Sequence, residues 1–218
     1  MASLQVVDLG RASYDSTLAL QTEALERVKS SDPERAELFL VEHDPPVITL
    51  GRRAENANLL AAPDFLAERG IEVRETGRGG DITYHGPGQL VAYPIIRLDL
   101  HGKDIHQYIR NLEEAVIRVL GQFGLTGSRI RGLTGVWVDG RKVCAIGVAA
   151  RRWVSYHGLA LNVCTDLDHF KLIVPCGISD KPVTSMQQLL GRDVSVSQVK
   201  SALVQSLTDV LGFDAPAV

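Results

Sequence analysis

Residues 135–148 read GVWVDGRKVCAIGV, and this stretch indicates what kind of sheet the chain builds. Its Asp139-Gly140 pair stands between two runs rich in β-branched and apolar residues, which is a strong signal for a tight antiparallel hairpin. Side chains on a strand alternate between the two faces of the sheet. If Arg141 points to solvent, Lys142 points inward, where a lysine is costly unless it is partnered or deprotonated. In the opposite register Lys142 is simply exposed, and the pattern leaves both registers open.

Predicted helices and further strands surround this hairpin. We predict strands over residues 4–9, 38–42, 46–51, 89–98 and 153–163, and helices over residues 14–29, 64–69 and 105–123 and from residue 195 onward. Asp104 can cap the third helix, and Ser195 with Gln198 fits a capping box at the fourth. Hairpins mixed with separated helices predict an α+β fold, a mixed β-sheet packed with helices, rather than a doubly wound parallel sheet. No repeat or linker-like segment divides residues 1–218, so we expect one domain.

The overall composition narrows the classes of partner. The chain has 218 residues, a net charge of -3 and a hydrophobic fraction of 45%, which suits a globular protein with no overall attraction to nucleic acid. The amino-terminal sequence has no basic start followed by an apolar run, and the apolar runs are too short to span a bilayer. We therefore expect a cytoplasmic protein that binds neither nucleic acid nor membrane. Basic pairs such as Arg52-Arg53 are expected to be solvated surface charge.

The chain contains three cysteines, of which one is a candidate nucleophile. The odd number and the absence of a CxxC pair argue against a disulfide framework and a zinc site. Cys144 and Cys164 follow or interrupt β-rich apolar runs, so we expect them to pack in the core. Cys176 lies in IVPCGISD, between Pro175 and Gly177, where a loop leaves an apolar segment. A cysteine nucleophile needs its thiolate, and therefore a nearby cation or base. The candidates for that group are Lys142, His85 and His157.

A second unusual stretch is RGGDITYHGPGQL, residues 78–90. Glycine lets a backbone approach another group closely, so polar residues held between such turns belong either to a site or to a tight corner. The stretch lacks the ending of a phosphate-binding P-loop and the spacing of a dinucleotide fingerprint. His85 is a ligand, a base or a turn residue, and its sequence context does not choose among these.

Four ordered blocks of this sequence resemble the octanoyltransferases, also called lipoyl(octanoyl) transferases, of lipoate biosynthesis. The blocks are RGGDITYHGPGQLVAYPI (78–95), GVWVDGRKVCAIGV (135–148), HGLALNV (157–163) and IVPCGISDKPVTSM (173–186). Their order and spacing also match, and the resemblance covers nearly the whole chain. One departure is Cys144, where alanine is more usual, which puts a second thiol close to the site. The resemblance implies the mixed-sheet fold shared by biotin and lipoate protein ligases.

The resemblance also implies a reaction and the residues that perform it. An octanoyl group passes from octanoyl-acyl carrier protein to Cys176 as a thioester, and then to a specific lysine of a lipoyl domain, with no cofactor and no ATP. The acceptors implied are the lipoyl domains of 2-oxoacid dehydrogenase complexes and the glycine cleavage H protein. Lys142 is implied as the catalytic partner of Cys176. The implied substrate-binding residues are Arg78, Gly79, Gly80, Asp81, Ile82, Thr83, Tyr84, His85, Ala145, Ile146, Gly147, Gly158, Leu159 and Ala160.

Three rival functions make different demands on the same residues. An ATP-dependent lipoate or biotin ligase would need an adenylate site and would not need Cys176. A non-catalytic acyl-binding module would keep an apolar pocket but tolerate loss of the thiol. A hydrolase that pairs Cys176 with His85 or His157 would release free octanoate. A further hypothesis concerns the acidic carrier protein, which we expect to dock on a patch formed by Arg129, Arg131, Arg151 or Arg152.

Overall fold

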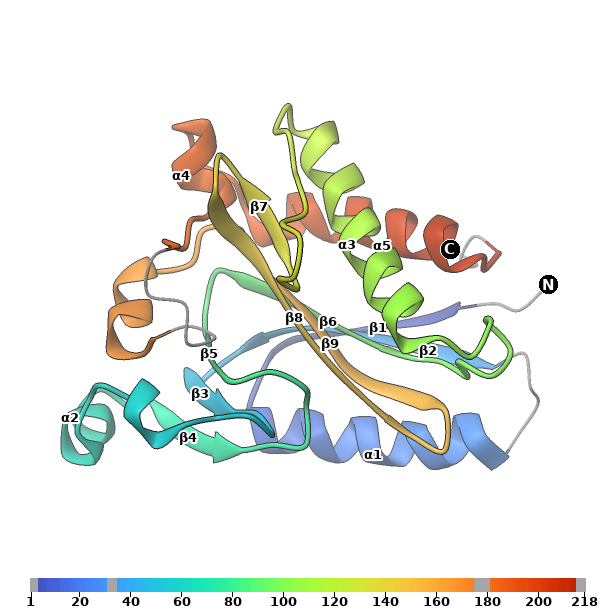
Figure 1. The fold of residues 1–218 in the computed structure, drawn as a ribbon, viewed down its shortest axis with the longest axis horizontal. Coiled ribbons are helices and arrows are strands. Elements are labelled where there is room, and N and C mark those ends of the chain that lie inside the picture. Colours follow the sequence, from blue (N-terminus) through green and yellow to red (C-terminus); the bar gives the residue numbers. More distant parts are fainter. Residues whose placement is uncertain (1–3, 31–34, 175–180, 215–218) are drawn as a thin grey trace.

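The computed structural model describes residues 4–30, 35–174 and 181–214, and a large mixed sheet lies at its centre (Figure 1). The sheet has six strands in the order β1-β2-β6-β9-β8-β7. Their bounds are Leu4–Ala12 for β1, Ala36–His43 for β2, Gln89–Ile95 for β6, Val154–Asn162 for β9, Arg141–Arg151 for β8 and Val136–Val138 for β7. β1 pairs with β2 in parallel, whereas the other neighbouring strands pair antiparallel. The mixed sheet confirms the predicted α+β class.

Helices cover both faces of this sheet. Helices α3 (Ile105–Gln122) and α5 (Val196–Leu211) lie on one face, and helix α1 (Tyr14–Ser30) lies on the other (Figure 1). Alternation along β2 shows how one strand serves both layers. Leu38 and Leu40 join the core beneath α3 and α5, whereas Phe39 and Val41 pack toward α1.

A smaller sheet lies beside α1 on the same side of the large sheet (Figure 1). It has the order β4-β3-β5, with β4 at Glu72–Glu75, β3 at Val47–Leu50 and β5 at Ile82–His85. Short helical segments flank the sheets, namely η1 (Asn56–Asn58), α2 (Pro63–Glu68), η2 (Leu167–Leu172) and α4 (Met186–Leu190). Ile48, Ile82 and Phe170 belong to the separate small core of this region.

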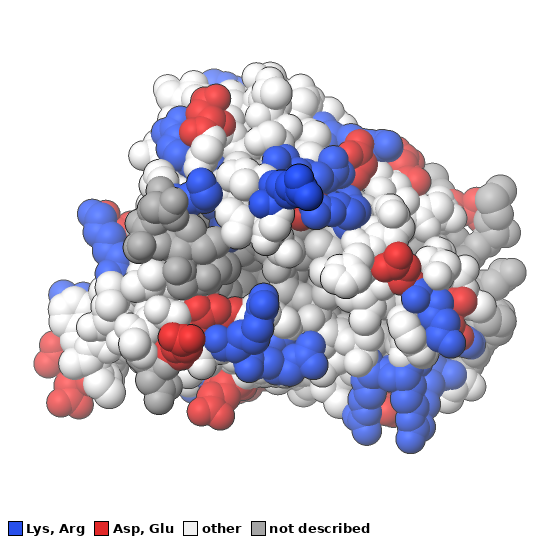
Figure 2. Space-filling view, in the orientation of Figure 1, with Lys and Arg blue, Asp and Glu red and all other residues white. Residues whose placement is uncertain are grey.

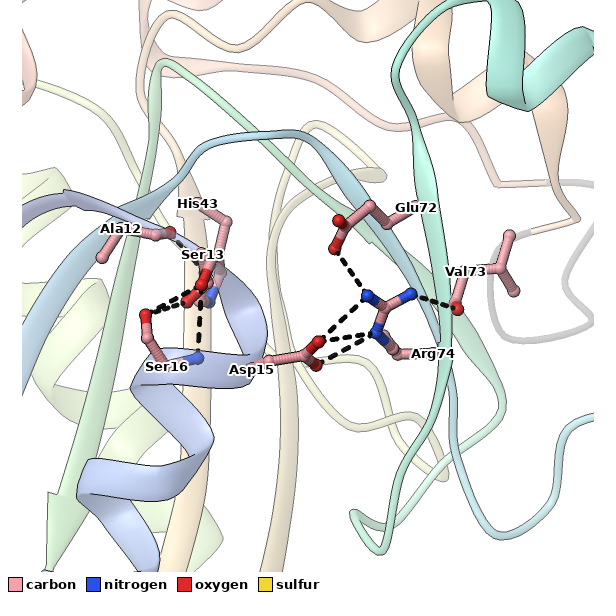
Figure 3. A network of polar contacts seen from close by, with 8 residues as sticks. All are labelled: Ala12, Ser13, Asp15, Ser16, His43, Glu72, Val73 and Arg74. Carbon is pink, nitrogen blue, oxygen red and sulfur yellow. Dashed lines mark hydrogen bonds and ion pairs between the residues drawn. The ribbon is translucent and has the colours of Figure 1, made fainter.

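A polar network joins the small sheet to the start of α1 (Figure 3). Arg74 of β4 donates from Nε and Nη2 to the carboxylate of Asp15 at 2.9–3.1 Å, and its Nη2 lies 3.2 Å from Glu72. Ser13 caps the helix, because its Oγ accepts from the backbone N–H of Ser16. Since Arg74 and Asp15 are partly exposed, the network orients the two layers more than it stabilises them.

Local sequence signals predicted most of these elements. Asp139 and Gly140 have φ of 49° and 73°, as a tight type I′ hairpin turn requires. The Asp104 side chain accepts from two backbone N–H groups of α3, and Ser195 with Gln198 forms the predicted capping box. Strands β4 and β5 and helix α4 were not predicted, because each is short. No helix of the described residues is both long and apolar enough to cross a membrane.

Candidate active site

A cavity lies between the large sheet and the glycine-rich stretch of the small sheet. Its empty space, open mouth included, is about 480 Å³. Strands β8 and β9 form its floor, and residues of β5 and of the loop before it cover the floor. The lining residues are Tyr14, Arg78, Gly79, Gly80, Thr83, His85, Val91, Tyr93, Ala145, Ile146, Gly147, His157, Gly158, Leu159 and Ala160.

Lys142 lines a second, adjoining cavity. Its empty space, open mouth included, is about 280 Å³, and it shares Thr83, Ala145 and Ala160 with the first cavity, so the two are neighbours. Lys142 is only 7% exposed, which confirms the inward register and excludes the exposed one. Its Nζ lies 5.2 Å from the centre of the fully buried Trp137 ring, a position in which the ring attracts an ammonium group.

Cys176 lies outside the described residues, but the chain on both sides of it is anchored. On the amino-terminal side, the Val174 N–H donates to the carbonyl of Asn58 at 2.8 Å. On the carboxyl-terminal side, the backbone of Lys142 donates to Pro182 and accepts from Thr184, each at 2.9 Å. Residues 182–184 therefore run beside the strand that carries Lys142.

A chain of buried side-chain hydrogen bonds leads from the glycine-rich stretch to residues 182–184. His85 Nδ1 donates to Gln89 Oε1 at 2.7 Å, and Gln89 Nε2 donates to Asn162 Oδ1 at 2.9 Å. Asn162 Nδ2 in turn donates to the Thr184 carbonyl at 3.0 Å. His85, Gln89, Asn162 and Thr184 are all buried. Because Thr184 also pairs with the backbone of Lys142, this chain orders the second cavity.

The loop that contains Gly79 and Gly80, here called the glycine loop, closes one end of the first cavity. This is the end that lies farther from Lys142. The Gly79 N–H donates to the Val148 carbonyl at 2.9 Å, which brings the loop down onto β8. A Cβ on Gly147 would lie 2.9 Å from the Gly79 carbonyl, and a Cβ on Gly158 would lie 2.2 Å from the Ala92 carbonyl. Glycine at 147 and 158 therefore permits the close backbone packing that shapes this end.

Arg78 supports the loop rather than projecting into solvent. It is 7% exposed, and its guanidinium donates to the Thr49 carbonyl, the Thr49 hydroxyl and the Gly79 carbonyl at 2.6–3.1 Å. These bonds hold the loop between β3 and β8. Arg78 also provides positive charge next to the histidines of the cavity.

Burial keeps the histidines around the cavity neutral. It lowers the pKa of His43 to about 4 and that of His157 to about 3. Burial, and then the neighbouring His43, hold the pKa of His85 well below its usual range. His157 pairs with Val148, six residues along β8 from Lys142, or about 20 Å at the rise of a strand. His157 therefore cannot partner a group beside Lys142.

The structure separates the predicted substrate-binding residues into two groups. Eleven of the fourteen line the first cavity: Arg78, Gly79, Gly80, Thr83, His85, Ala145, Ile146, Gly147, Gly158, Leu159 and Ala160. Asp81, Ile82 and Tyr84 line neither cavity. Ile82 and Tyr84 face the small core because they alternate with Thr83 and His85 along β5. Asp81 instead accepts from the side-chain amide of Asn58 at 2.6 Å and so fixes the turn before α2.

Several residues of the site carried no usable sequence signal. Tyr14 and Tyr93 reach the cavity from α1 and β6, and nothing local to them marks a site. Asn162 and Trp137 sit inside apolar strand runs, where each resembles an ordinary core position. Alternation along β6 was the one available clue, because it places Tyr93 on the same face as Val91.

The other cysteines and the arginines fall in different surroundings. Cys144 is fully buried, and burial raises the pKa of its thiol to about 12, as expected of a packing residue. Cys164 is only half-buried at the edge of the core.

Arg129 binds Glu113 and Glu114 near β7, whereas Arg151 lies at the opposite end of β8. Arg129 and Arg151 therefore do not share one patch, and Figure 2 shows basic side chains in separate groups on this face. Docking of the acidic carrier on any of the four arginines stays a prediction.

Metal chemistry has no evident site in the described part of the chain. Within residues 4–30, 35–174 and 181–214, no group of three or more histidine, cysteine, aspartate or glutamate side chains is arranged to hold a metal ion. His43 and His85 instead bond to neighbouring polar groups. His43 Nε2, for example, lies 2.7 Å from the hydroxyl of Tyr93.

Known proteins share both the fold and the sequence of this chain. Residues 13–208 match the family described as the lipoyl protein ligase A/B catalytic domain. The fold is similar to a putative lipoate protein ligase from T. acidophilum, with a TM-score of 0.77 and 20% identity over 98% of this chain and 87% of that one. A lipoate-protein ligase A bound with ATP gives a TM-score of 0.76 at 20% identity, over 99% and 88% of the two chains. At these identities the structural likeness concerns the fold alone.

Sequence relatives give a finer assignment. An octanoyltransferase from Chloroflexus aggregans is 50% identical over 95% of this chain and 94% of its own length. Another from Nitratidesulfovibrio vulgaris is 48% identical over 97% and 95% of the two lengths. The chain therefore belongs to the lipoyl protein ligase A/B catalytic domain family. Within that family it groups with the octanoyltransferases, and it is an acyltransferase.

Proposed function

We propose that this acyltransferase moves an octanoyl group from octanoyl-acyl carrier protein to a specific lysine of a lipoyl domain, through a thioester on Cys176. The observation that carries the proposal is the buried Lys142, which opens on a cavity system and pairs through its backbone with residues 182–184. Cys176 stands six positions before Pro182 in the sequence, and the proposal places its thiol beside Lys142. Residues 1–218 act as one catalytic domain in the cytoplasm.

The first half of the reaction loads the enzyme. A proton passes from Cys176 Sγ to Lys142 Nζ, which leaves a thiolate beside an ammonium group. The thiolate attacks the carbonyl carbon of the octanoyl thioester. The bond from that carbon to the carrier sulfur breaks, and the departing carrier thiolate takes the proton from Lys142. The product is octanoyl-Cys176 and a free carrier thiol.

The second half transfers the acyl group to protein. The amine of the lipoyl-domain lysine attacks the acyl-Cys176 carbonyl, Lys142 accepts the surplus proton, and the Cys176 thiolate leaves and is then reprotonated. One thioester is exchanged for another and then for an amide, so no ATP is required. The acceptors are lipoyl domains of 2-oxoacid dehydrogenase complexes and the glycine cleavage H protein.

The first cavity holds the acyl tail in this proposal. Its residues nearest Lys142 include Ala145, Ile146, Leu159 and Ala160, which offer apolar surface. Each buried methylene contributes about 0.8 kcal/mol, so an octanoyl tail gains on the order of 5 kcal/mol. Strands β8 and β9 thus orient the octanoyl tail, and β8 also carries Lys142.

Intact-protein mass spectrometry tests the proposal. The wild type, Cys176→Ala and Cys164→Ala are each mixed with octanoyl-acyl carrier protein without ATP. We expect one octanoyl adduct on the wild type and on Cys164→Ala, none on Cys176→Ala, and loss of the adduct when a lipoyl domain is added. Octanoylation that requires ATP and free octanoate would mean a ligase instead. Release of free octanoate without transfer would mean a hydrolase.

A further inference from the structure

Lys142 lies against the indole ring of Trp137, and no step of the proposed reaction uses this contact. The two residues are direct neighbours across the β7–β8 pair. Lys142 Nζ lies over the ring, 5.2 Å from its centre, which is within the range of a cation–π interaction. The ring is fully buried and Lys142 is nearly so. Such an interaction is strongest where both groups are removed from water, so this contact is of the strong kind.

The backbone of Trp137 is held on both of its sides. On one side Trp137 pairs with Lys142 in the antiparallel ladder. On the other side, the Trp137 N–H donates to the Ser128 carbonyl at 3.0 Å, and the Ser128 N–H donates to the Trp137 carbonyl at 2.7 Å. The Ser128 hydroxyl donates to the same carbonyl at 3.2 Å. The position of the ring beside Lys142 is therefore fixed by main-chain bonds as well as by packing.

Gly135 packs against both members of this pair. A Cβ at Gly135 would lie 3.4 Å from Cη2 of the Trp137 ring and 3.6 Å from Cε of Lys142. The backbone of Gly135 therefore runs beside the edge of the ring and the end of the lysine stem. Its N–H donates to Oε1 of Glu113 at 3.1 Å, and Glu113 is a fully buried carboxylate that also binds two arginines. Helix α3 thus fixes the segment that confines the lysine stem next to the ring.

The face of an indole ring distinguishes the two protonation states of a lysine. Its negative electrostatic potential attracts an ammonium group far more than a neutral amine. In the proposed loading step, Lys142 Nζ changes from amine to ammonium as it takes the proton of Cys176. The ring therefore favours the state in which the thiolate has formed. The same attraction holds Nζ at the wall of the second cavity, which Lys142 lines.

We propose that Trp137 is a positioning residue of the acyl transfer, and that its ring holds the Lys142 ammonium in place and favours the charged form as the proton arrives. The inference rests on the proposed function, in which Lys142 accepts that proton. A tryptophan that only fills the core contributes shape and apolar surface, and the electron density of its ring does not matter. The two roles therefore differ in their response to a ring of nearly the same shape but weaker negative face.

Fluorinated tryptophans test the role of the ring, because fluorine withdraws electrons from the ring face with little change of shape. We would incorporate mono-, di- and trifluorotryptophan at position 137 and measure formation of the octanoyl adduct in a single turnover. The maximal rate should fall stepwise, by about tenfold for the trifluoro ring, while the carrier concentration for half the maximal rate changes less than about twofold. Trp153 is the matched control, because its ring lies 5.1 Å from Lys103 Nζ but is 36% exposed and lines neither cavity. The same substitutions at 153 should leave the rate unchanged. Equal rates along the series at 137, or an equal fall at 153, would overturn the inference.

A double-mutant cycle measures the contact without any acyl transfer. Trifluorotryptophan at position 137 is combined with Lys142 or with Lys142→Met, which keeps an unbranched stem and removes the charge, and urea unfolding is measured for all four proteins. Fluorination should raise the equilibrium constant for unfolding about tenfold more in the lysine protein than in the methionine protein, which corresponds to about 1.4 kcal/mol. Equal effects in the two proteins would overturn the inference even if octanoyl transfer proceeds as proposed. A clear coupling in a protein that forms no octanoyl adduct would support the contact and would refute the proposed reaction instead.

Discussion

Removal of the Asn162 side chain should weaken both the fold and the reaction. Its amide is 4% exposed, accepts from Gln89 at 2.9 Å and donates to the Thr184 carbonyl at 3.0 Å. In Asn162→Ala, Gln89 keeps a bond to the Tyr84 carbonyl, but the Thr184 carbonyl loses its side-chain donor. An orphaned buried acceptor costs about 1–3 kcal/mol and the lost bond to Gln89 about 1 kcal/mol, so we expect a loss of about 2–4 kcal/mol in the free energy of unfolding.

The catalytic effect of Asn162→Ala follows from the position of residues 182–184. These residues pair with the backbone of Lys142, and Val183 lines the same cavity. Looser packing there should lower kcat by about tenfold and change KM little, because misplacement of a reacting group acts on the chemical step. Urea unfolding and steady-state transfer kinetics measure the two effects.

Gln188→Ala provides the matched control for Asn162→Ala. The Gln188 side chain accepts from the Thr184 hydroxyl at 2.9 Å, but Gln188 is exposed, so water replaces that bond. We expect a change below about 0.5 kcal/mol and normal kcat. If Asn162→Ala behaved like this control in both assays, the buried chain from His85 to Thr184 would not order the site.

Two further predictions concern stability. Gly158→Ala should lower the free energy of unfolding by about 1–3 kcal/mol or more, as measured in urea, because its Cβ would lie 2.2 Å from the Ala92 carbonyl. Gly121→Ala, in open space on α3, should instead raise the free energy of unfolding by up to about 1 kcal/mol. Equal effects of the two substitutions would contradict the packing argument. The folded state keeps His43 and His157 neutral, with pKa values of about 4 and 3, whereas the unfolded chain binds protons below pH 6.5. Stability should therefore be complete above pH 6.5 and fall toward pH 4 by up to about 1.4 kcal/mol per pH unit for each histidine. His43→Phe should flatten this slope, and parallel curves for variant and wild type would contradict it.

The elements that the sequence predicted correctly depend on bonds between near neighbours. The hairpin at Asp139-Gly140, the cap at Asp104 and the capping box at Ser195 each form within four residues, so a short window contains every partner. The parallel pairing of β1 with β2, and the division of β2 and β3 between two sheets, join segments through packing that no window contains. Topology therefore needed the family resemblance, and propensity alone did not supply it.

For single side chains of the site, too, local sequence signals identify some positions and miss others. Alternation alone could have assigned Thr83 to the cavity and Tyr84 to the small core, because β5 has the ordinary two-residue period. The same rule predicted an inward Lys142 once Arg141 was taken to face solvent, and its 7% exposure confirms that prediction. Tyr14 could not be found in this way, because α1 brings it to the cavity from a separate layer. A sequence therefore shows which face of a strand lines a cavity more readily than it shows which residues of another layer line the same cavity.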